Sequence, residues 1–374
     1  MSSPQAAYIH VPFCRHRCGY CNFTLVAGRD DLIAAYLDAL ERELQQLAQP
    51  RPVRTVFFGG GTPTHLPPAQ LSRLLTLARH WFPWPANAEV SVEANPSDLD
   101  DERLAVLAAA GVTRLSIGVQ SWNAAKLAVL ERDHSAEIIE QAVRRARPMF
   151  RSISLDLIFG VAGETRSTWQ KDVARTVQLA PDHVSTYGLT YERGTSFWTR
   201  RAKGSLHPVS EDDELWMYEH AIDTLAASGW QHYEVSNFAR LDHRCQHNEV
   251  YWNGEEYYAA GPGAARYVDG TREMNHRSTT TYIKRLLAGQ SPVAERETLG
   301  PEDRARERLV FGLRRLEGID VEDFAQQMSF TVEQLGGKSI ARFLSIGLLQ
   351  QQDKTLSLTR KGLLVSDSLW PELL

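Results

Sequence analysis

Three of the four cysteines in this sequence lie close together near the amino terminus. They form the pattern Cys14-x-x-x-Cys18-x-x-Cys21, whereas the fourth, Cys245, is distant in the sequence. Thiolates at this spacing on one loop can converge on a small inorganic core. A four-iron cluster held by three thiolates keeps one iron without a protein ligand. The spacing therefore predicts an iron–sulfur cluster with one open coordination position.

The open iron determines what chemistry such a cluster can do. The amino and carboxylate groups of S-adenosylmethionine can chelate it, and an electron from the cluster then breaks the sulfonium bond to give an adenosyl radical. The alternative is a zinc site completed by His10 or His16. Zinc sites usually present paired Cys-x-x-Cys halves, so the observed spacing favours the cluster.

Composition and charge exclude several classes of protein. The chain has 374 residues, with 41 Lys and Arg against 46 Asp and Glu, and its net charge of −5 supplies no general field for nucleic acid. No stretch reaches the ~18 apolar residues of a membrane span, and the first residues do not resemble a signal peptide. Clustered thiols without a disulfide framework are typical of a reducing compartment. We expect a folded cytoplasmic protein that does not bind nucleic acid.

Short apolar runs alternate with helical stretches from residue 6 to about residue 195. This alternation is typical of repeated βα units around a parallel sheet. Six units are too few for a closed eight-stranded barrel, so we expect an α/β fold built as an open, partial (β/α)6 TIM-like barrel with its site at the carboxyl ends of the strands. A doubly wound open sheet is the alternative. The predicted strands are 7–12, 55–58, 89–93, 114–119, 152–159 and 183–189, and the predicted helices among them are 33–47, 71–81, 101–110, 136–147 and 168–179.

The second half of the chain departs from this alternation. A helix over 211–229 and a strand over 232–238 precede a glycine and aromatic-rich connection at 248–267. After residue 292, helical periodicity followed by a short hairpin predicts a winged-helix-like domain, and its interleaved acidic and basic residues favour a packing or partner role over DNA binding. We therefore expect three parts, a barrel core, a connection carrying a His-Asn-x-x-Tyr-Trp element and a C-terminal α+β domain, over residues 1–240, 241–291 and 292–374.

Polar residues mark the ends of successive predicted strands. The second strand ends in Gly59-Gly60-Gly61-Thr62-Pro63, and glycines there let backbone groups approach a ligand closely. Glu93 ends the third strand, Gln120 ends the fourth, and Asp156 lies on the fifth. Each residue alone is a satisfied barrel polar group about as often as a ligand contact. Three successive strands that carry such residues are harder to explain by packing, so we expect a ligand site.

With these features the chain resembles the radical S-adenosylmethionine superfamily. A closer resemblance covers nearly the whole chain and is to the oxygen-independent coproporphyrinogen III oxidase-like family, within it to the branch of heme chaperones. Phe23 stands where the true oxidases have a fourth cysteine, and only seven residues precede Tyr8, too few for the oxidases' N-terminal arm. The segments that carry the resemblance are 8–14, 156–160, 187–192, 233–239 and the His247-Asn248-x-x-Tyr251-Trp252 element.

The resemblance implies cofactors, partners and site residues. It implies a [4Fe–4S] cluster on Cys14, Cys18 and Cys21, S-adenosylmethionine, heme, acceptor apo-hemoproteins of which some are membrane-associated, and an electron donor such as flavodoxin or ferredoxin. A second S-adenosylmethionine, which the oxidases hold, is left open. By resemblance, the residues that contact S-adenosylmethionine are Tyr8, Tyr20, Gly60, Gly61, Thr62, Glu93, Gln120, Arg132, Asp156 and Gly188.

His247 is the candidate heme ligand. An imidazole nitrogen is a natural axial ligand, and the aromatic side chains around it can offer flat apolar faces to a porphyrin. The alternative is a core histidine in an aromatic-rich loop. Ala265 stands where the chaperones generally show a histidine, which removes one further polar contact. For Cys245 we favour a buried apolar filler over a second heme ligand or the site of a covalent link.

Two functions from different classes follow from these observations. As a binding protein, the chain holds heme and transfers it to acceptor proteins. As an enzyme, it abstracts hydrogen from the propionate side chains of coproporphyrinogen III and releases carbon dioxide. Hydrogen abstraction needs tight positioning in a closed pocket, so Phe23 and the missing arm favour the chaperone. A radical enzyme with an unrelated small substrate is a third alternative.

Overall fold

The computed structural model describes residues 3–374 and contains a central sheet of nine strands. All six predicted strands are present, and they pair in parallel in the order in which they occur along the chain. Because the order of these six strands never reverses, they contain no switch point, and the open barrel is confirmed over the doubly wound alternative. In spatial order the strands are β11 (Tyr258–Ala260), β1 (Ala6–Val11), β4 (Thr55–Gly60), β5 (Glu89–Ala94), β6 (Arg114–Gln120), β7 (Ser152–Phe159), β8 (His183–Gly188), β10 (Asn237–Ala239) and β9 (Gln231–Glu234).

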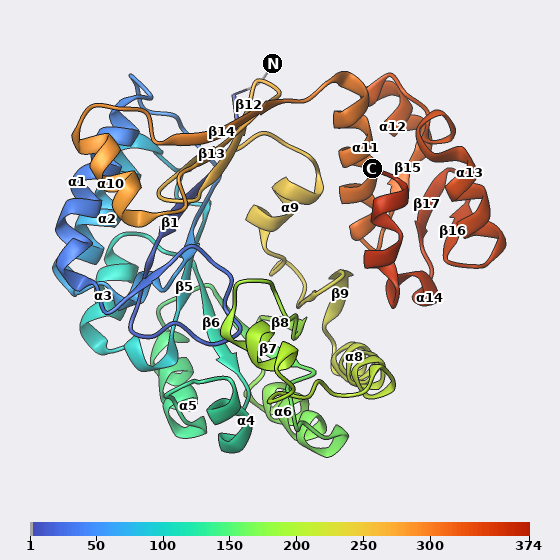
Figure 1. The fold of residues 1–374 in the computed structure, drawn as a ribbon, viewed down its shortest axis with the longest axis horizontal. Coiled ribbons are helices and arrows are strands. Elements are labelled where there is room, and N and C mark those ends of the chain that lie inside the picture. The colour runs from blue at the N-terminus through green and yellow to red at the C-terminus, as the bar shows by residue number, and fades with distance from the viewer. Residues whose placement is uncertain (1–2) are drawn as a thin grey trace.

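Helices cover the outer side of this curved sheet (Figure 1). The five predicted helices are confirmed to within a few residues. The apolar face of the first buries Ile33, Tyr36, Leu37 and Leu40 against the sheet, as its three- and four-residue spacing requires. The helices are α1 (Ile33–Gln45), α2 (Pro68–Trp81), α3 (Asp101–Ala109), α5 (Ala136–Ala146) and α6 (Arg166–Leu179), with the short α4 (Ala124–Val129) between β6 and α5 and α7 (Ser196–Ala202) after β8.

The middle of the chain is more regular than the sequence suggests. The single strand expected at 232–238 is instead the antiparallel pair β9 and β10, because residues 235 and 236 form a turn. The expected connection carries α9 (Gln246–Trp252), which packs against β4, and β11, which adds a seventh parallel strand beside β1. A three-residue strand is too short to show a period in sequence. A separate antiparallel sheet follows, made of β12 (Ala265–Val268), β13 (Thr271–Asn275) and β14 (Val293–Thr298), with α10 (Thr279–Leu287) packed on α1.

The C-terminal domain contains the expected helices and hairpin. The chain ends in the short α14 (Arg360–Leu363) and two 3₁₀ turns. Arg360 donates to both carboxylate oxygens of Asp223 at 2.6 and 3.0 Å and so connects α14 to α8 (Glu211–Ala227). The remaining elements are α11 (Pro301–Arg314), α12 (Val321–Met328), α13 (Val332–Ser345), β15 (Ile319–Asp320), β16 (Leu349–Gln352) and β17 (Thr355–Leu358).

These C-terminal elements lie across α9 from the barrel, so the barrel and the C-terminal domain face each other (Figure 1). Contacts of α11 with α9 hold the two parts together. Between residues 3 and 374, no helix combines the length and the apolar character that crossing a membrane requires.

Candidate functional site

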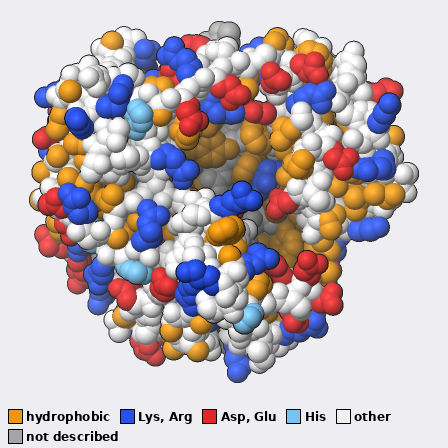
Figure 2. Space-filling view, viewed as in Figure 1, with side chains coloured by type: hydrophobic (Ala, Val, Ile, Leu, Met, Phe, Trp, Pro, Cys, Tyr) orange, Lys and Arg blue, Asp and Glu red, His pale blue; other side chains and the backbone are white. Residues whose placement is uncertain are grey.

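A cavity of about 1600 Å³ occupies the inner side of the barrel. It reaches from the cysteine loop to residues 363–368 of the C-terminal domain, and Figure 2 shows the hollow on the face of the molecule. Pockets for single small molecules measure roughly 300–1,000 Å³, so this cavity has room for more than one group. Every residue that the sequence suggested for a site lines it, namely Tyr8, Cys14, Cys18, Tyr20, Cys21, Gly60, Gly61, Thr62, Glu93, Gln120, Arg132, Asp156, Gly188 and His247.

The three cysteines lie on one loop at the edge of this cavity. Cys14 ends β2 (Phe13–Cys14), which pairs with β3 (Val26–Ala27) and so closes the loop that carries Cys18 and Cys21. The Sγ of Cys14 lies 3.3 Å from Oγ1 of Thr62. Burial raises the pKa of Cys14 to about 11 and also raises the pKa of Cys21. These thiols therefore hold their protons until a metal replaces them, since a coordinating thiol is deprotonated outright.

The two histidines that a zinc site would need have other partners. The Nε2 atom of His10 lies 2.6 Å from the carbonyl oxygen of Thr24, and its Nδ1 lies 3.0 Å from the Tyr8 hydroxyl. His16 Nε2 lies 3.2 Å from a carboxylate oxygen of Glu131. Either histidine would have to give up these hydrogen bonds to complete a zinc site.

The glycine loop at the end of β4 has no room for side chains. Gly60 has φ +104°, and a Cβ on it would lie 2.2 Å from the His10 ring. A Cβ on Gly61 would lie 2.7 Å from the carbonyl oxygens of Val11 and Phe13, and one on Gly59 would lie 2.9 Å from the Glu93 carboxyl. Side chains are excluded here, so the loop presents bare backbone to the cavity. This fits a ligand such as the methionine part of S-adenosylmethionine.

Two half-buried carboxyl groups face the cavity, Glu93 on β5 and Asp156 on β7. Burial raises the pKa of Glu93 to about 7, and the nearby Asp156 adds to the effect. Burial also raises the pKa of Asp156, although the Ser116 hydroxyl donates to both its oxygens at 3.0 and 3.1 Å. A buried carboxylate is costly without a cation. The pair therefore suits a positively charged ligand, and S-adenosylmethionine carries a sulfonium and an ammonium group.

Gln120 and Arg132 form the neighbouring wall. Gln120 ends β6 with φ +63°, a conformation that costs a non-glycine residue energy and is held by its surroundings. Arg132 donates to the carbonyl oxygen of Gly118 at 3.0 Å and to Sγ of Cys18 at 3.7 Å. Its Nε is buried and has no partner among the residues that the structure describes. This wall thus offers a spare donor to an anionic group, such as a carboxylate of a bound ligand.

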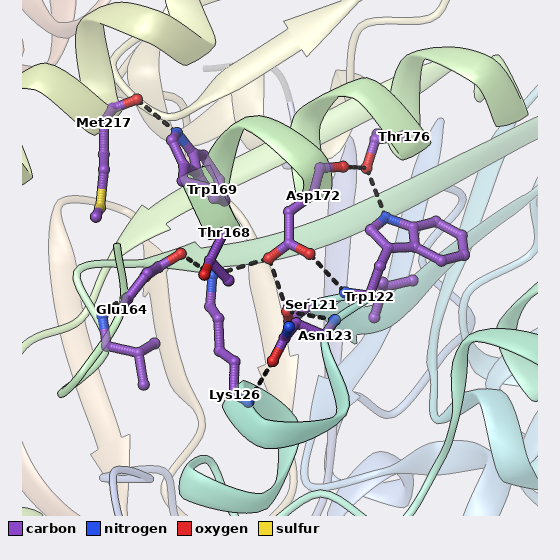
Figure 3. Close-up of polar contacts among 12 residues, drawn as sticks. Ser121, Trp122, Asn123, Lys126, Glu164, Thr168, Trp169, Asp172, Thr176 and Met217 are labelled. Carbon is purple, nitrogen blue, oxygen red and sulfur yellow. Dashed lines mark hydrogen bonds and ion pairs between the residues drawn. The ribbon is translucent and has the colours of Figure 1, made fainter. Parts of the chain in front are cut away.

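A buried polar network holds this wall from behind (Figure 3). Asp172 on α6 accepts from the Ser121 hydroxyl at 2.7 Å and from the Trp122 N–H at 2.8 Å. Lys126 on α4 donates to Asp172 at 3.0 Å and to Glu164 at 2.5 Å. All three charged side chains are almost fully buried. The network thereby fixes the segment between Gln120 and α4, which leads to Arg132. Sequence reasoning missed it, because charged residues on a helix normally face water.

His247 lies on α9 and is 1% exposed. Its Nδ1 is 3.0 Å from the Thr55 hydroxyl and its Nε2 is 2.8 Å from the Tyr251 hydroxyl, so both ring nitrogens have partners. Its ring stacks on Phe57 with 5.3 Å between centroids. Burial lowers the pKa of His247 to about 3, which keeps the imidazole neutral. A neutral imidazole is the form that ligates iron, but ligation requires one of these hydrogen bonds to break.

The environment of Cys245 agrees with a structural role. The residue is 1% exposed, and its thiol lies 3.6 Å from a carboxylate oxygen of Glu89. The same carboxylate accepts from the backbone N–H groups of Gln246 and His247 at 3.0 and 2.9 Å, so it caps the start of α9. This contact attaches the helix that carries His247 to the barrel.

Sequence reasoning missed several residues that line the cavity. Arg114 and His183 begin β6 and β8 and are both buried, and Nε of Arg114 has no partner within residues 3–374. A charged or polar residue at the start of an apolar strand was the available signal. Tyr187 and residues 363–368 also line the cavity. No local pattern marks the latter as part of a site, because only the tertiary fold brings the C-terminal domain to the barrel.

Comparison with known proteins agrees with this geometry. Residues 8–175 match the family model described as the Radical SAM superfamily, and residues 299–365 match the HemN C-terminal domain. The solved structure of coproporphyrinogen III oxidase (HemN) from Escherichia coli superposes with a TM-score of 0.88 at 26% identity, covering 99% of this chain and 90% of that chain. Barrel and C-terminal domain therefore define a radical S-adenosylmethionine protein with the fold of that oxidase.

Relatives that match this chain over its full length assign it to a narrower family within that superfamily. Heme chaperone HemW of Lactococcus lactis is 36% identical over 100% of this chain and 98% of its own length. Heme chaperone HemW of Bacillus subtilis is 34% identical over 98% of both chains. The chain belongs to the oxygen-independent coproporphyrinogen III oxidase-like family, in its branch of radical S-adenosylmethionine heme chaperones. Members of this superfamily use a [4Fe–4S] cluster and S-adenosylmethionine.

Proposed function

We propose that this protein is a heme chaperone that carries a [4Fe–4S] cluster and S-adenosylmethionine, binds heme and transfers it to acceptor proteins. The observation that carries the proposal is the match, over essentially the whole of both chains, to relatives that are named heme chaperones. The cavity supports it, because its volume of about 1600 Å³ leaves space beside the residues proposed for the cluster and S-adenosylmethionine.

In this proposal Cys14, Cys18 and Cys21 hold three irons of the cluster. When bound, the cluster supplies an electron to S-adenosylmethionine at its fourth iron. The side chains around it bind and orient that molecule, and Thr62 and Arg132 contact two of the sulfurs at 3.3 and 3.7 Å. Glu93 and Asp156 face its positive groups, and Arg132 offers its spare donor to the carboxylate. The remaining proposed contacts are Tyr8, Tyr20, Gly60, Gly61, Gln120 and Gly188.

His247 is the axial ligand in this proposal. It becomes available when the Tyr251 hydroxyl, 2.8 Å from Nε2, moves away. The pKa of about 3 keeps the ring neutral and so able to ligate iron at physiological pH. The acceptors are apo-hemoproteins, some of them at membranes, the electron donor is a small redox protein such as flavodoxin or ferredoxin, and the protein acts in the cytoplasm.

A second candidate function is oxidation of coproporphyrinogen III. The structural likeness to the Escherichia coli oxidase, with a TM-score of 0.88, favours it. The identity to that oxidase is 26%, below the 34–36% identity to the heme chaperones. Phe23 stands two residues after Cys21, at the position where the oxidases have a fourth cysteine. Its side chain is 66% exposed and lines the cavity, so an apolar ring takes the place of that thiol.

One experiment separates the two candidates. The full chain is reconstituted anaerobically with iron and sulfide, and one sample is divided between a heme titration followed by Soret absorbance and product analysis with coproporphyrinogen III, S-adenosylmethionine and a reductant. The proposal predicts saturable heme uptake and no decarboxylated product. Turnover to the decarboxylated porphyrinogen would overturn it and establish the oxidase.

A further inference from the structure

Four large hydrophobic side chains are exposed to solvent at the edge of the cavity. They are Phe23, Tyr187, Leu215 and Val365, with exposed fractions of 66, 44, 42 and 44%. We call these four residues the apolar rim, and Figure 2 shows hydrophobic side chains at the edge of the hollow. A single exposed hydrophobic residue needs no explanation, but several around one cavity form a patch that marks a binding surface.

The apolar rim is assembled from four distant parts of the chain. Phe23 follows the last cluster cysteine, Tyr187 lies near the end of β8, Leu215 lies on α8, and Val365 follows α14 in the C-terminal domain. The ion pair of Arg360 with Asp223 bridges α14 and α8, the helices beside Val365 and Leu215. The C-terminal domain thereby supplies one wall of the cavity.

Charge is distributed unequally around this rim. Beside Phe23, Arg277 donates to the carbonyl oxygen of Asn22 at 3.0 Å and to the hydroxyl of Thr24 at 3.2 Å. Arg277 is exposed and has no ion-pair partner within residues 3–374. Arg15, on the same side, is 65% exposed but already lies 3.6 Å from Asp98 and 3.4 Å from Asp133, so Arg277 is the cation available to a ligand there. The opposite side, near Leu215 and Val365, is acidic, and the carboxyl groups that line the cavity there are Glu211, Asp212, Glu214 and Asp367.

A ligand that matches this distribution is flat and apolar, with carboxylates on one edge only. Its ring would contact the apolar rim, its carboxylates would lie toward Arg277, and its uncharged edge would lie toward Leu215 and Val365. The acidic side would repel the carboxylates and so exclude the reversed orientation. Heme has this distribution, with two propionates on one edge of a macrocycle.

We infer that the apolar rim is the surface that holds the heme macrocycle, with Arg277 binding a propionate and the C-terminal domain forming the opposite wall. The inference rests on the proposed function, since it places the heme of that proposal. It does not depend on which side chain ligates the iron, because it concerns the ring and the propionates alone.

Substitutions on the rim test this inference in the reconstituted full chain. Leu215→Asp and Val365→Asp place a charge under the ring, and Arg277→Gln removes a propionate partner while keeping a polar side chain. Heme titration should show affinity lower by roughly tenfold in each variant. The two Asp variants lose an apolar side chain that the heme ring would cover, and Arg277→Gln loses a charge-assisted hydrogen bond to a propionate. The cluster absorbance and the affinity for S-adenosylmethionine should not change, and they report that each variant is folded.

Two matched controls lie away from the cavity. Leu241 is 73% exposed and does not line the cavity, so Leu241→Asp introduces the same charge at an exposed apolar site. Lys171 is exposed on α6, so Lys171→Gln removes a surface cation. Both control variants should bind heme as the unaltered chain does.

The outcomes separate this inference from the proposed function. If the unaltered chain takes up no heme, the proposed function itself fails. If it binds heme and the three rim variants bind it equally well, the location of the heme is wrong while heme binding stands. If Leu241→Asp and Lys171→Gln weaken heme binding as much as the rim variants, the loss of affinity does not depend on the position of the changed residue, and the inference is overturned as well.

Discussion

The backbone N–H of Gly60 donates a hydrogen bond of 3.0 Å to Oε2 of Glu93. The two residues lie at the carboxyl ends of the adjacent parallel strands β4 and β5. The glycine has no side chain to block this contact, and its positive φ aims the N–H at the carboxylate. This part of the cavity wall thus depends on one backbone conformation and one half-buried carboxyl group.

Gly60→Ala should abolish binding of S-adenosylmethionine and lower the free energy of unfolding. The added Cβ would lie 2.2 Å from the His10 ring at φ +104°, and backbone strain of this kind costs about 1–3 kcal/mol before the clash is counted. Equilibrium dialysis and urea denaturation measure the two effects. Gly163→Ala is the matched control, because Gly163 also has a positive φ, +78°, but nothing lies within 4 Å of its Cβ position. Equal losses of S-adenosylmethionine binding and of stability in both variants would show that the close approach of Gly60 to His10 is not the cause.

Glu93→Gln should remove part of the pH dependence of stability. The Glu93 carboxyl has a pKa of about 7 in the fold and an ordinary value of 4.5, so the folded chain binds the additional proton between these pH values. Stability therefore falls as pH rises from about 4.5 to about 7 and then levels off, and this carboxyl accounts for roughly 3 kcal/mol of the fall. Glutamine can still accept from Gly60 and carries no charge. Urea denaturation of both chains across this range should show a smaller fall in the variant, and identical pH profiles would refute the assignment.

Lys126→Met should destabilise the chain by about 3–5 kcal/mol, because it leaves Glu164 and Asp172 buried without their cation. Arg29→Met is the comparison, since it breaks an exposed pair with Asp31 of 2.8 Å, and such pairs contribute only about 0–1 kcal/mol. Denaturant titration of the two variants gives the two values. Similar values would show that the network in Figure 3 contributes no more than a surface ion pair.

Much of the barrel could be predicted from sequence, because its signals are local. The six strands and five helices follow from apolar periodicity, and the cysteine loop and Gly60 mark the site by residue type and spacing. Local pattern fails where partners are distant. Lys126 and Asp172 look like surface charges until the fold buries them together, β11 is too short to show a period, and Val365 joins the cavity only through domain packing.

His247→Ala should weaken heme binding by at least about tenfold, because removal of an iron ligand lowers the affinity at least as much as removal of a residue that only orients a ligand. The cluster spectrum should not change. Tyr251→Phe should not weaken heme binding, since it removes the hydroxyl that holds Nε2 at 2.8 Å. Soret titration of both variants measures these affinities. Unaltered affinity in His247→Ala would eliminate the residue as the axial ligand.

The most direct test of the account is the iron and acid-labile sulfide content of the anaerobically reconstituted chain. The account predicts about four of each per chain, lost in Cys14→Ser, Cys18→Ser and Cys21→Ser and retained in Cys245→Ser, whose thiol is buried against Glu89. Zinc in place of iron, iron without sulfide, or loss of the cluster in Cys245→Ser would contradict it.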